Sequence, residues 1–268
     1  RLLPQREEAF ERLRASFMGT KQGREQAQAL AQLIETRLSQ PGFTPANEQA
    51  LRQELVQLYT GPLNDRGRAK IELEKSLAKN PSSAQALYML GKLHADDAEY
   101  EQAVLRLSQY GQVEQRPAQL VALHLLLGEL YAEKLKDVGK AMQQYSSVLQ
   151  LQPQNALALS RLVELFMQQN KPQGALPLLK RLVKYTDDKA KKIDFLHRVA
   201  QLSESLGDSR SALEALRQAV ELDPRNLPAI AELARYYEQK SDLQSLRIHL
   251  DRSAARFRPQ LRERPRDL

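Results

Sequence analysis

The sequence has 268 residues, of which 42% are hydrophobic and only 6% aromatic, with no Trp and no Cys. The absence of Cys excludes disulfides, thiolate metal sites and cysteine nucleophiles, and burial must come mostly from Leu and Ala, which favours packed helices over a sheet sandwich. The 40 Lys and Arg exceed the 33 Asp and Glu, giving a net charge of +7 that raises nucleic acid as an alternative partner. No uncharged apolar run approaches the roughly 18 residues of a membrane span.

The basic residues do not form one continuous surface. One cluster runs from Lys180 to Lys192 and another from Arg252 to Arg266, whereas the stretch from Pro81 to Asn155 is slightly acidic. We interpret both clusters as solvated outer faces of helices, because charged residues normally cover these faces. The charge distribution therefore argues against nucleic acid as the main partner.

The N-terminal residues predict a degenerate helical pair within 1–43. The first helix is expected near Glu7 to Met18 and the second from Arg24 to Ser39, with a Gly-bounded turn between them. Five residues stand at the spacing of the later units, and we expect them to pack in the same way: Leu13, Phe17, Ala29, Leu33 and Pro41.

The next pair has clear start and stop signals. Thr44 or Asn47 is a candidate cap for a helix from Ala46 to Thr60, because short polar side chains accept hydrogen bonds from the first free N–H groups. Gly61-Pro62 is a strong turn signal. A second helix is expected from Asp65 to Lys79.

The stretch from Val121 to Asn155 is the clearest unit of a pattern that recurs along the chain. Its landmarks are Leu127-Gly128, Tyr131, Ala141, Tyr145 and Pro153. Small residues that would let paired helices approach closely recur at Gly91, Gly128, Ala200 and Ala234, and on second helices at Ala69, Ala103, Ala141, Ala175 and Ala212. Prolines that cannot continue a helix follow at Pro81, Pro153 and Pro224.

This order of residues, at a period of about 34, resembles the tetratricopeptide repeat. The resemblance implies an all-α fold, an α-solenoid in which helical hairpins stack as a right-handed superhelix. We expect about seven units, several of them degenerate. After the pair in 1–43, the array covers 44–257, with units near 46–82, 83–117, 118–154, 155–188, 189–225 and 226–257, and 258–268 is a tail or the start of a truncated repeat.

The resemblance also implies that a partner is bound in a concave groove lined by the first helix of each unit. The lining would be of mixed charge with an acidic middle, which suits a ligand with Lys or Arg beside apolar side chains. The residues that the resemblance nominates are Tyr88, Lys92, Asp96, Leu125, Glu129, Glu133, Ser160, Glu164, Gln168, His197, Gln201, Glu204, Ala231, Arg235 and Glu238.

One subgroup of the family holds the C-terminal carboxylate of chaperones with a Lys and an Asn one helical turn apart. The matching positions here carry Tyr88 with Lys92, Leu125 with Glu129, and Ser160 with Glu164. The resemblance therefore does not extend to that clamp, and binding of a chaperone tail is disfavoured.

Catalytic patterns are absent from the sequence. The four histidines, His94, His124, His197 and His249, do not have a metal-ligand spacing such as His-x-x-x-His. The carboxylate pairs Asp96-Asp97 and Asp187-Asp188 are adjacent in sequence, so their side chains point apart and helix-end or capping roles are expected. We predict a protein that is not an enzyme and that needs no cofactor or metal.

The function that this pattern favours is a protein-interaction scaffold. The partner would be a protein or peptide, which includes another domain of the same polypeptide, and exposed terminal repeats would allow self-association. The alternative is a helical repeat protein that binds RNA or another nucleic acid. We expect a cytoplasmic protein without a membrane span; the first residue is Arg1 rather than Met, which indicates a fragment or a processed form and leaves a removed signal peptide open.

Overall fold

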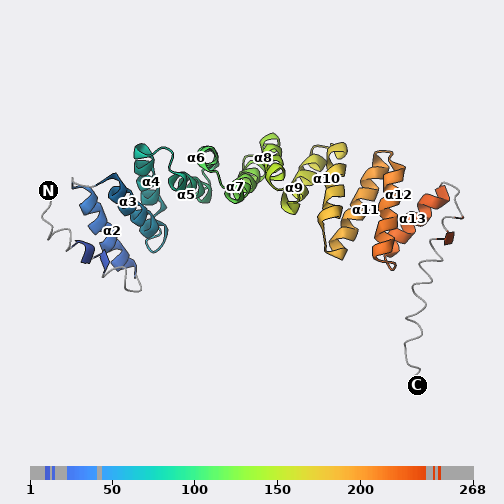
Figure 1. Ribbon diagram of the computed structural model, residues 1–268, viewed down its shortest axis with the longest axis horizontal. Helices are drawn as coiled ribbons and strands as arrows, with labels where there is room; N and C mark the ends of the chain where they lie inside the picture. The colour runs from blue at the N-terminus through green and yellow to red at the C-terminus, as the bar shows by residue number, and fades with distance from the viewer. Residues whose placement is uncertain are drawn as a thin grey trace, which may run out of the picture. The chain divides into compact units, whose positions relative to one another are not determined.

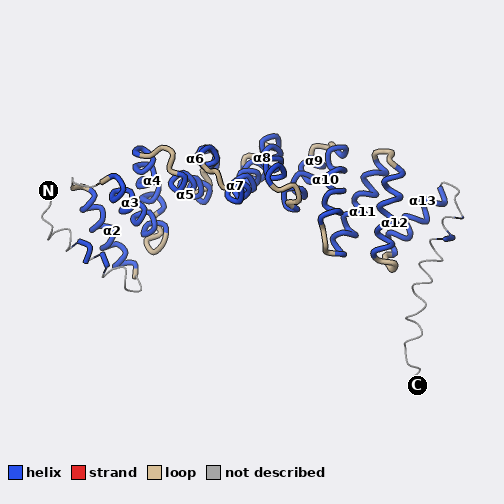
Figure 2. Tube along the Cα trace, viewed as in Figure 1, coloured by secondary structure: helices blue, strands red, loops and turns tan. Residues whose placement is uncertain are grey.

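The computed structural model describes residues 10–12, 14–15, 23–40, 44–239, 244 and 247–248. Every regular element within these residues is a helix (Figure 2). The chain divides into two compact units, Arg1–Lys136 and Asp137–Leu268. The expected all-α fold built from stacked helical hairpins is confirmed.

The helices follow one another along each unit in chain order (Figure 1). Unit 1 contains α2 (Arg24–Leu38), α3 (Pro45–Thr60), α4 (Arg66–Lys79), α5 (Ala84–Asp96), α6 (Tyr100–Val113), α7 (Pro117–Glu129) and the π-helical turn η1 (Leu130–Lys134). Unit 2 contains α8 (Val138–Leu151), α9 (Ala156–Gln168), α10 (Pro172–Tyr185), α11 (Lys189–Ser205), α12 (Ser209–Leu222) and α13 (Leu227–Gln239). Within a unit, each α-helix packs against the one before and the one after it, which is the nearest-neighbour packing of a repeat protein.

Local capping signals explain where the helices begin and end. Thr44 caps α3, since its side chain accepts a hydrogen bond from the N–H of Asn47, and Asp65 caps α4 in the same way. After α11, Gly207 adopts a φ of 76°, the left-handed conformation common just past a helix end, and Asp208 caps α12. The predicted helices in 24–79 agree with α2, α3 and α4 to within one residue at each end.

Small residues lie where the two helices of a hairpin meet. A Cβ atom added to Gly91 of α5 would lie 2.7 Å from Cγ of Leu107 on α6. On the second helices, Ala69, Ala103 and Ala175 are completely buried. The predicted close approach is confirmed at these positions, and the physical reason is that larger side chains would push the helices apart.

In the first pair the packing predicted for Ala29 is wrong, because this residue is exposed. Leu33 is partly buried and packs against the core as expected, but the fully buried stripe of α2 includes neither residue. The buried apolar positions are Ala27, Leu30, Ala31 and Ile34. The prediction rested on the spacing of the later units, whereas these four residues follow the i, i+3, i+4, i+7 spacing of an amphipathic helix.

The connection between α6 and α7 is organised by one buried carboxylate. Glu114 follows the last turn of α6 and accepts hydrogen bonds from the backbone N–H groups of Gln115 and Arg116, at 3.0 and 2.9 Å. The Arg116 guanidinium also donates to it, and the Tyr110 hydroxyl donates at 2.6 Å. The link between α6 and α7 is therefore ordered by hydrogen bonds to this carboxylate.

The junction between the two units falls inside the unit predicted at 118–154. Unit 1 ends two residues after η1, and α8 begins unit 2. The π-turn has an N–H of Leu135 bonded to the carbonyl of Leu130 at 2.9 Å, a spacing of five residues that no local motif predicts. The predicted repeat borders stay predictions.

Several predictions lie outside the described residues: the packing of Leu13, Phe17 and Pro41, the role of His249, the cluster from Arg252 to Arg266 and the tail 258–268. Within the described part of the chain, no helix has the length and apolar character needed to cross a membrane.

Candidate functional site

The predicted groove residues of unit 1 lie mostly in solvent. On α5, Tyr88, Lys92 and Asp96 are exposed. The Tyr88 ring leans on the buried ring of Tyr110 in α6, with centroids 5.1 Å apart, so its position is fixed by the second helix of its own hairpin. Tyr88 is 37% exposed, so part of its side chain remains accessible to a ligand.

The π-turn changes the arrangement on the next first helix. Leu125 is half-buried, and Glu129 and Glu133 are exposed. The prediction that Glu133 follows Glu129 on one face assumes an α-helical period, but residues 130–134 form the wider η1 turn. Glu133 is therefore rotated about the helix axis from the expected direction.

In unit 2 the nominated residues of α9 make few contacts with the rest of the protein. Ser160 is half-buried, while Glu164 and Gln168 are exposed. Glu164 forms an ion pair with Arg161 at 3.1 Å, a surface contact that contributes little to stability. These side chains remain available to a partner at small cost.

On α11, His197 is tied to the start of α13. Its Nε2 lies 3.3 Å from Oδ1 of Asn226, which also accepts a hydrogen bond from the N–H of Ala229 and so caps α13. Its Nδ1 lies 3.7 Å from a carboxylate oxygen of Glu232. His197 therefore has a structural function in joining two first helices, in addition to any contact with a ligand.

Three nominated residues meet around one cleft between α11 and α13. Gln201, Glu204 and Arg235 line a hollow of about 230 Å³, whose floor is formed by α12. The remaining lining residues are Ala200, Ala212, Leu216, Glu232 and Tyr236. The structure thus brings together predicted residues that lie more than thirty positions apart in the sequence, while Glu238 is exposed on α13 outside this lining.

A second hollow adjoins the first on α11. It has a volume of about 190 Å³ and is lined by Met167, Leu179, Arg198, Gln201, Leu202 and Ser205. Gln201 belongs to both hollows. The first-helix side of α9, α11 and α13 therefore carries a track of two adjoining hollows, which we call the first-helix track.

Sequence reasoning missed Glu232 and Tyr236. Both line the cleft beside the nominated Arg235, because residues three apart or adjacent at a helix edge can border the same hollow. Extending the nominated set by one helical turn on α13 would have found Glu232. Tyr236 has no such signal, since an aromatic residue there is equally consistent with packing.

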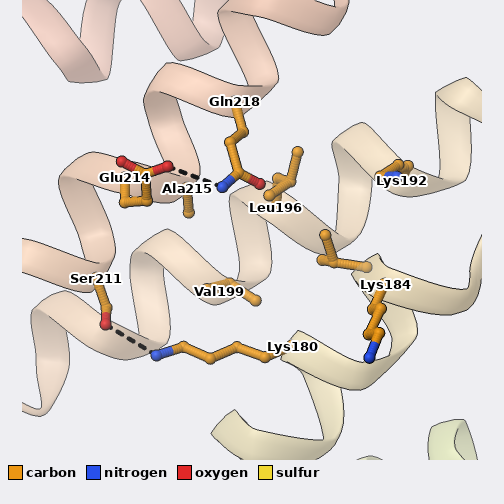
Figure 3. Close-up of a pocket in the computed structure, with 10 residues that line it drawn as sticks. Lys180, Lys184, Lys192, Leu196, Val199, Ser211, Glu214, Ala215 and Gln218 are labelled. Atoms are coloured by element: carbon orange, nitrogen blue, oxygen red, sulfur yellow. Dashed lines mark hydrogen bonds between the residues drawn. The ribbon is translucent and has the colours of Figure 1, made fainter.

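A larger cleft lies on the other side of the hairpins, between the second helices α10 and α12. It has a volume of about 510 Å³ and contains Lys180, Lys184 and Lys192 (Figure 3). The sequence predicts these lysines to be plain solvated surface. That prediction is incomplete, because the four-residue spacing of Lys180 and Lys184 puts both on one face of α10, beside a hollow.

Stacked helical hairpins with hollowed faces define the class of helical-repeat proteins, which present extended surfaces to other molecules. A family model described as tetratricopeptide repeat matches residues 130–192, and a second with the same description matches residues 193–226. Residues 130–226 therefore match tetratricopeptide repeats, as the spacing of this part of the sequence predicts. This family supports a general role as a protein–protein interaction scaffold.

The fold is similar to that of several solved structures. The C-terminal part of a repeat-containing protein from Cytophaga hutchinsonii has 18% identity and a TM-score of 0.51, covering 84% of this chain and 92% of that chain. A structure of Naa15/Naa10 bound to HypK-THB has 14% identity and a TM-score of 0.57, covering 94% of this chain but 37% of that chain.

A third structure is described as YrrB, a TPR protein with an unusual peptide-binding site, with 17% identity, a TM-score of 0.48, and coverage of 75% of this chain and 98% of that chain. At such identities the likeness concerns the fold alone. No curated protein matches the sequence.

Proposed function

We propose that the chain is a non-catalytic scaffold that holds an extended segment of a protein partner along the first-helix track. The observation that carries this proposal is the cleft formed by Gln201, Glu204 and Arg235, which adjoins a second hollow through the shared Gln201. Two small hollows that share a lining residue fit a run of several side chains better than one compact small molecule.

The charges of the cleft favour a basic residue in the bound segment. Glu204 and Glu232 contribute two carboxylates and Arg235 one guanidinium. Glu204 forms no ion pair among the described residues, so its carboxylate is free to meet a Lys or Arg. Beside it, Ala200, Ala212 and Leu216 provide an apolar floor for a neighbouring side chain.

Charge reversal in the cleft tests this function. The probe is a short fluorescent peptide in which Lys and Arg flank a single Leu, titrated by anisotropy. We expect Glu204→Lys to weaken its binding about five- to tenfold, which is about 1 kcal/mol and in keeping with a solvent-accessible ion pair.

The matched control is Glu221→Lys, which changes the net charge equally on an exposed position of α12 outside both hollows. This control should leave the affinity unchanged. Equal loss of affinity in both variants would show that only the overall charge matters and would remove the basis for a site on the first-helix track.

A further inference from the structure

The larger cleft lies between α10, α11 and α12. Its walls are the second helices α10 and α12 and its floor is the first helix α11, whereas in the first-helix track first helices form the walls. Its ten lining residues are Lys180, Val183, Lys184, Lys192, Leu196, Val199, Ser211, Glu214, Ala215 and Gln218. Figure 3 shows the lysine side chains at its border and the apolar residues between them. We call it the lysine cleft.

The positive charge of the lysine cleft is largely unneutralised. Its lining has three lysines against one carboxylate, that of Glu214, and Glu214 accepts a hydrogen bond from Gln218 at 2.9 Å. Lys180 donates to the neutral hydroxyl of Ser211 at 2.8 Å (Figure 3). Within the described part of the chain, Lys184 and Lys192 form no ion pair, and the ammonium of Lys184 lies 5.5 Å from the centre of the Tyr185 ring.

One further carboxylate lies near the cleft. Asp208 caps α12, and its pKa is below the ordinary value because Ser211 donates hydrogen bonds to it and the positive charge of Lys180 lies close. This carboxylate is already satisfied by the N–H of Ser211 at 3.0 Å. It offsets part of the charge of Lys180 and leaves that of Lys184 and Lys192.

The floor of the lysine cleft is apolar. Leu196 and Val199 of α11 are 2% and 4% exposed, and Ala215 of α12 is 4% exposed. An apolar side chain placed on this floor would lose its contact with water, while charged neighbours in the same segment would reach the lysines. The cleft thus offers an apolar floor and positive charge at its border, which together suit a segment with an apolar side chain next to negatively charged ones.

Unit 1 contains the same groove in a closed form, between α4, α5 and α6. Counted from the buried alanines Ala69 and Ala175, Glu74 occupies the place of Lys180, and Arg106 similarly occupies that of Ala215. Arg106 forms an ion pair with Glu74 at 2.6 Å across the groove. The remaining hollow is about 260 Å³, half the size of the lysine cleft.

Larger side chains also stand in the equivalent groove between α8, α9 and α10. Leu178 stands at the place of Ala215, and Arg181 at that of Gln218. The guanidinium of Arg181 donates to the carbonyl of Pro153. A wide, cationic groove is therefore not a general consequence of the repeat; it depends on Ala215 and the lysines of α10 and α11.

We propose that the lysine cleft binds an acidic segment of a protein partner, with an apolar side chain on the floor and Asp or Glu carboxylates at Lys180, Lys184 and Lys192. Charge complementarity identifies the occupant. Single-stranded nucleic acid fits less well, because it gains affinity by stacking bases on aromatic rings, and no aromatic residue lines this cleft.

The test uses a short fluorescent peptide in which Asp and Glu flank a single Leu, measured by anisotropy against the full chain. The double variant Lys180→Glu/Lys184→Glu should weaken binding at least tenfold. Both side chains are exposed, so the variant should fold, and circular dichroism checks this.

The matched control is Lys189→Glu/Lys191→Glu. It makes the same change in net charge at exposed lysines of α11 that do not line the cleft. This control should change the affinity less than twofold. An equal loss in both double variants would overturn the lysine cleft as a site.

The variant Ala215→Arg supplies an independent test, since it introduces the residue that closes the groove in unit 1. It adds a positive charge, so general electrostatic attraction would strengthen the binding of an acidic peptide, whereas a filled cleft must weaken it. We expect a loss of at least fivefold. Unchanged or stronger binding by the folded variant would contradict the proposal, as would tighter binding of an oligothymidine that displaces the peptide.

Discussion

The crossing of α5 and α6 depends on the absence of a side chain at Gly91. A methyl group there would approach Cγ of Leu107 to 2.7 Å and its backbone nitrogen to 3.2 Å, and Leu107 is completely buried. Since interiors are close-packed, the helices would have to separate. The motif therefore specifies a distance between helices through one small residue.

We expect Gly91→Ala to lower the free energy of unfolding by about 1 to 3 kcal/mol, the usual cost of overpacking. Urea denaturation followed by circular dichroism measures this change. The matched control is Gly67→Ala in the first turn of α4, where a Cβ atom meets nothing closer than 3.5 Å; it should be neutral or stabilise by up to about 1 kcal/mol. Equal stability of the Gly91 variant and the parent would contradict the close crossing.

Glu114 makes the stability of unit 1 dependent on pH. The pKa of Glu114 lies well below its ordinary value of 4.5, because Arg116 and then Tyr110 donate hydrogen bonds to the carboxylate. Burial and the neighbouring Glu114 in turn raise the pKa of Tyr110 to about 12. Folding thus favours the ionised carboxylate and the neutral phenol.

The sign of the effect follows from these shifts. A depressed folded-state pKa stabilises the protein at pH values above the unfolded pKa, and this contribution decreases as the pH falls below about 4.5. Glu114→Gln should therefore lower the melting temperature at pH 7 and have a smaller effect at pH 3. A difference from the parent that is equal at both pH values would show that the carboxylate charge is not what holds the link.

At the scale of the helix, the ends are set by side chains within a few residues of them. Asp188 accepts hydrogen bonds from the N–H groups of Ala190 and Lys191, at 2.9 and 3.1 Å, and so caps α11. The capping function expected for the pair Asp187-Asp188 is thereby confirmed for its second member. In the other pair, Asp97 follows α5 and its carboxylate lies 2.6 Å from the ammonium of Lys70.

We expect Asp188→Ala to destabilise the protein by about 1 kcal/mol, the typical cost of losing an N-cap. Thermal unfolding measures it, with Asp187→Ala as the control, since Asp187 is exposed and lies one residue before the cap. The control removes the same charge and should have little effect. Similar losses in both variants would point to a charge effect at the helix end instead of the cap.

Most helix ends were predictable because capping and turn residues lie within a few positions of them. Two features of the helices, a proline inside α10 and a π-turn after α7, were not predictable in this way. Thr44, Asp65 and Gly207 mark helix ends by their own conformational preferences. Pro177 lies inside α10 against its usual tendency to end helices. Neither this helix nor the π-turn at Leu130–Lys134 can be read from neighbouring residues alone.

At the scale of the molecule, the first-helix residues were predictable from the repeat, but the clefts were not. The resemblance to the repeat family nominates Gln201, Glu204 and Arg235 as members of one surface. Their position around a hollow depends on the small Ala200 and Ala212, which also line it. The lysine cleft depends on the contrast between Ala215 and Arg106 at equivalent positions. Such contrasts in size become visible only when the helices are placed side by side.

The two proposed surfaces of unit 2 have opposite preferences. The first-helix track presents the free carboxylate of Glu204, and the lysine cleft presents three ammonium groups. Because the two clefts share no lining residue, we expect them to bind independently. One scaffold would then hold a basic segment and an acidic segment at the same time.

The most direct test titrates the basic and the acidic peptide each against Glu204→Lys and Lys180→Glu/Lys184→Glu. Our interpretation predicts that the first variant weakens only the basic peptide and the second only the acidic one, and that each peptide binds the parent equally well when the other is present at saturation. Competition between the peptides for the parent protein, or loss of both in either variant, would contradict two separate recognition surfaces.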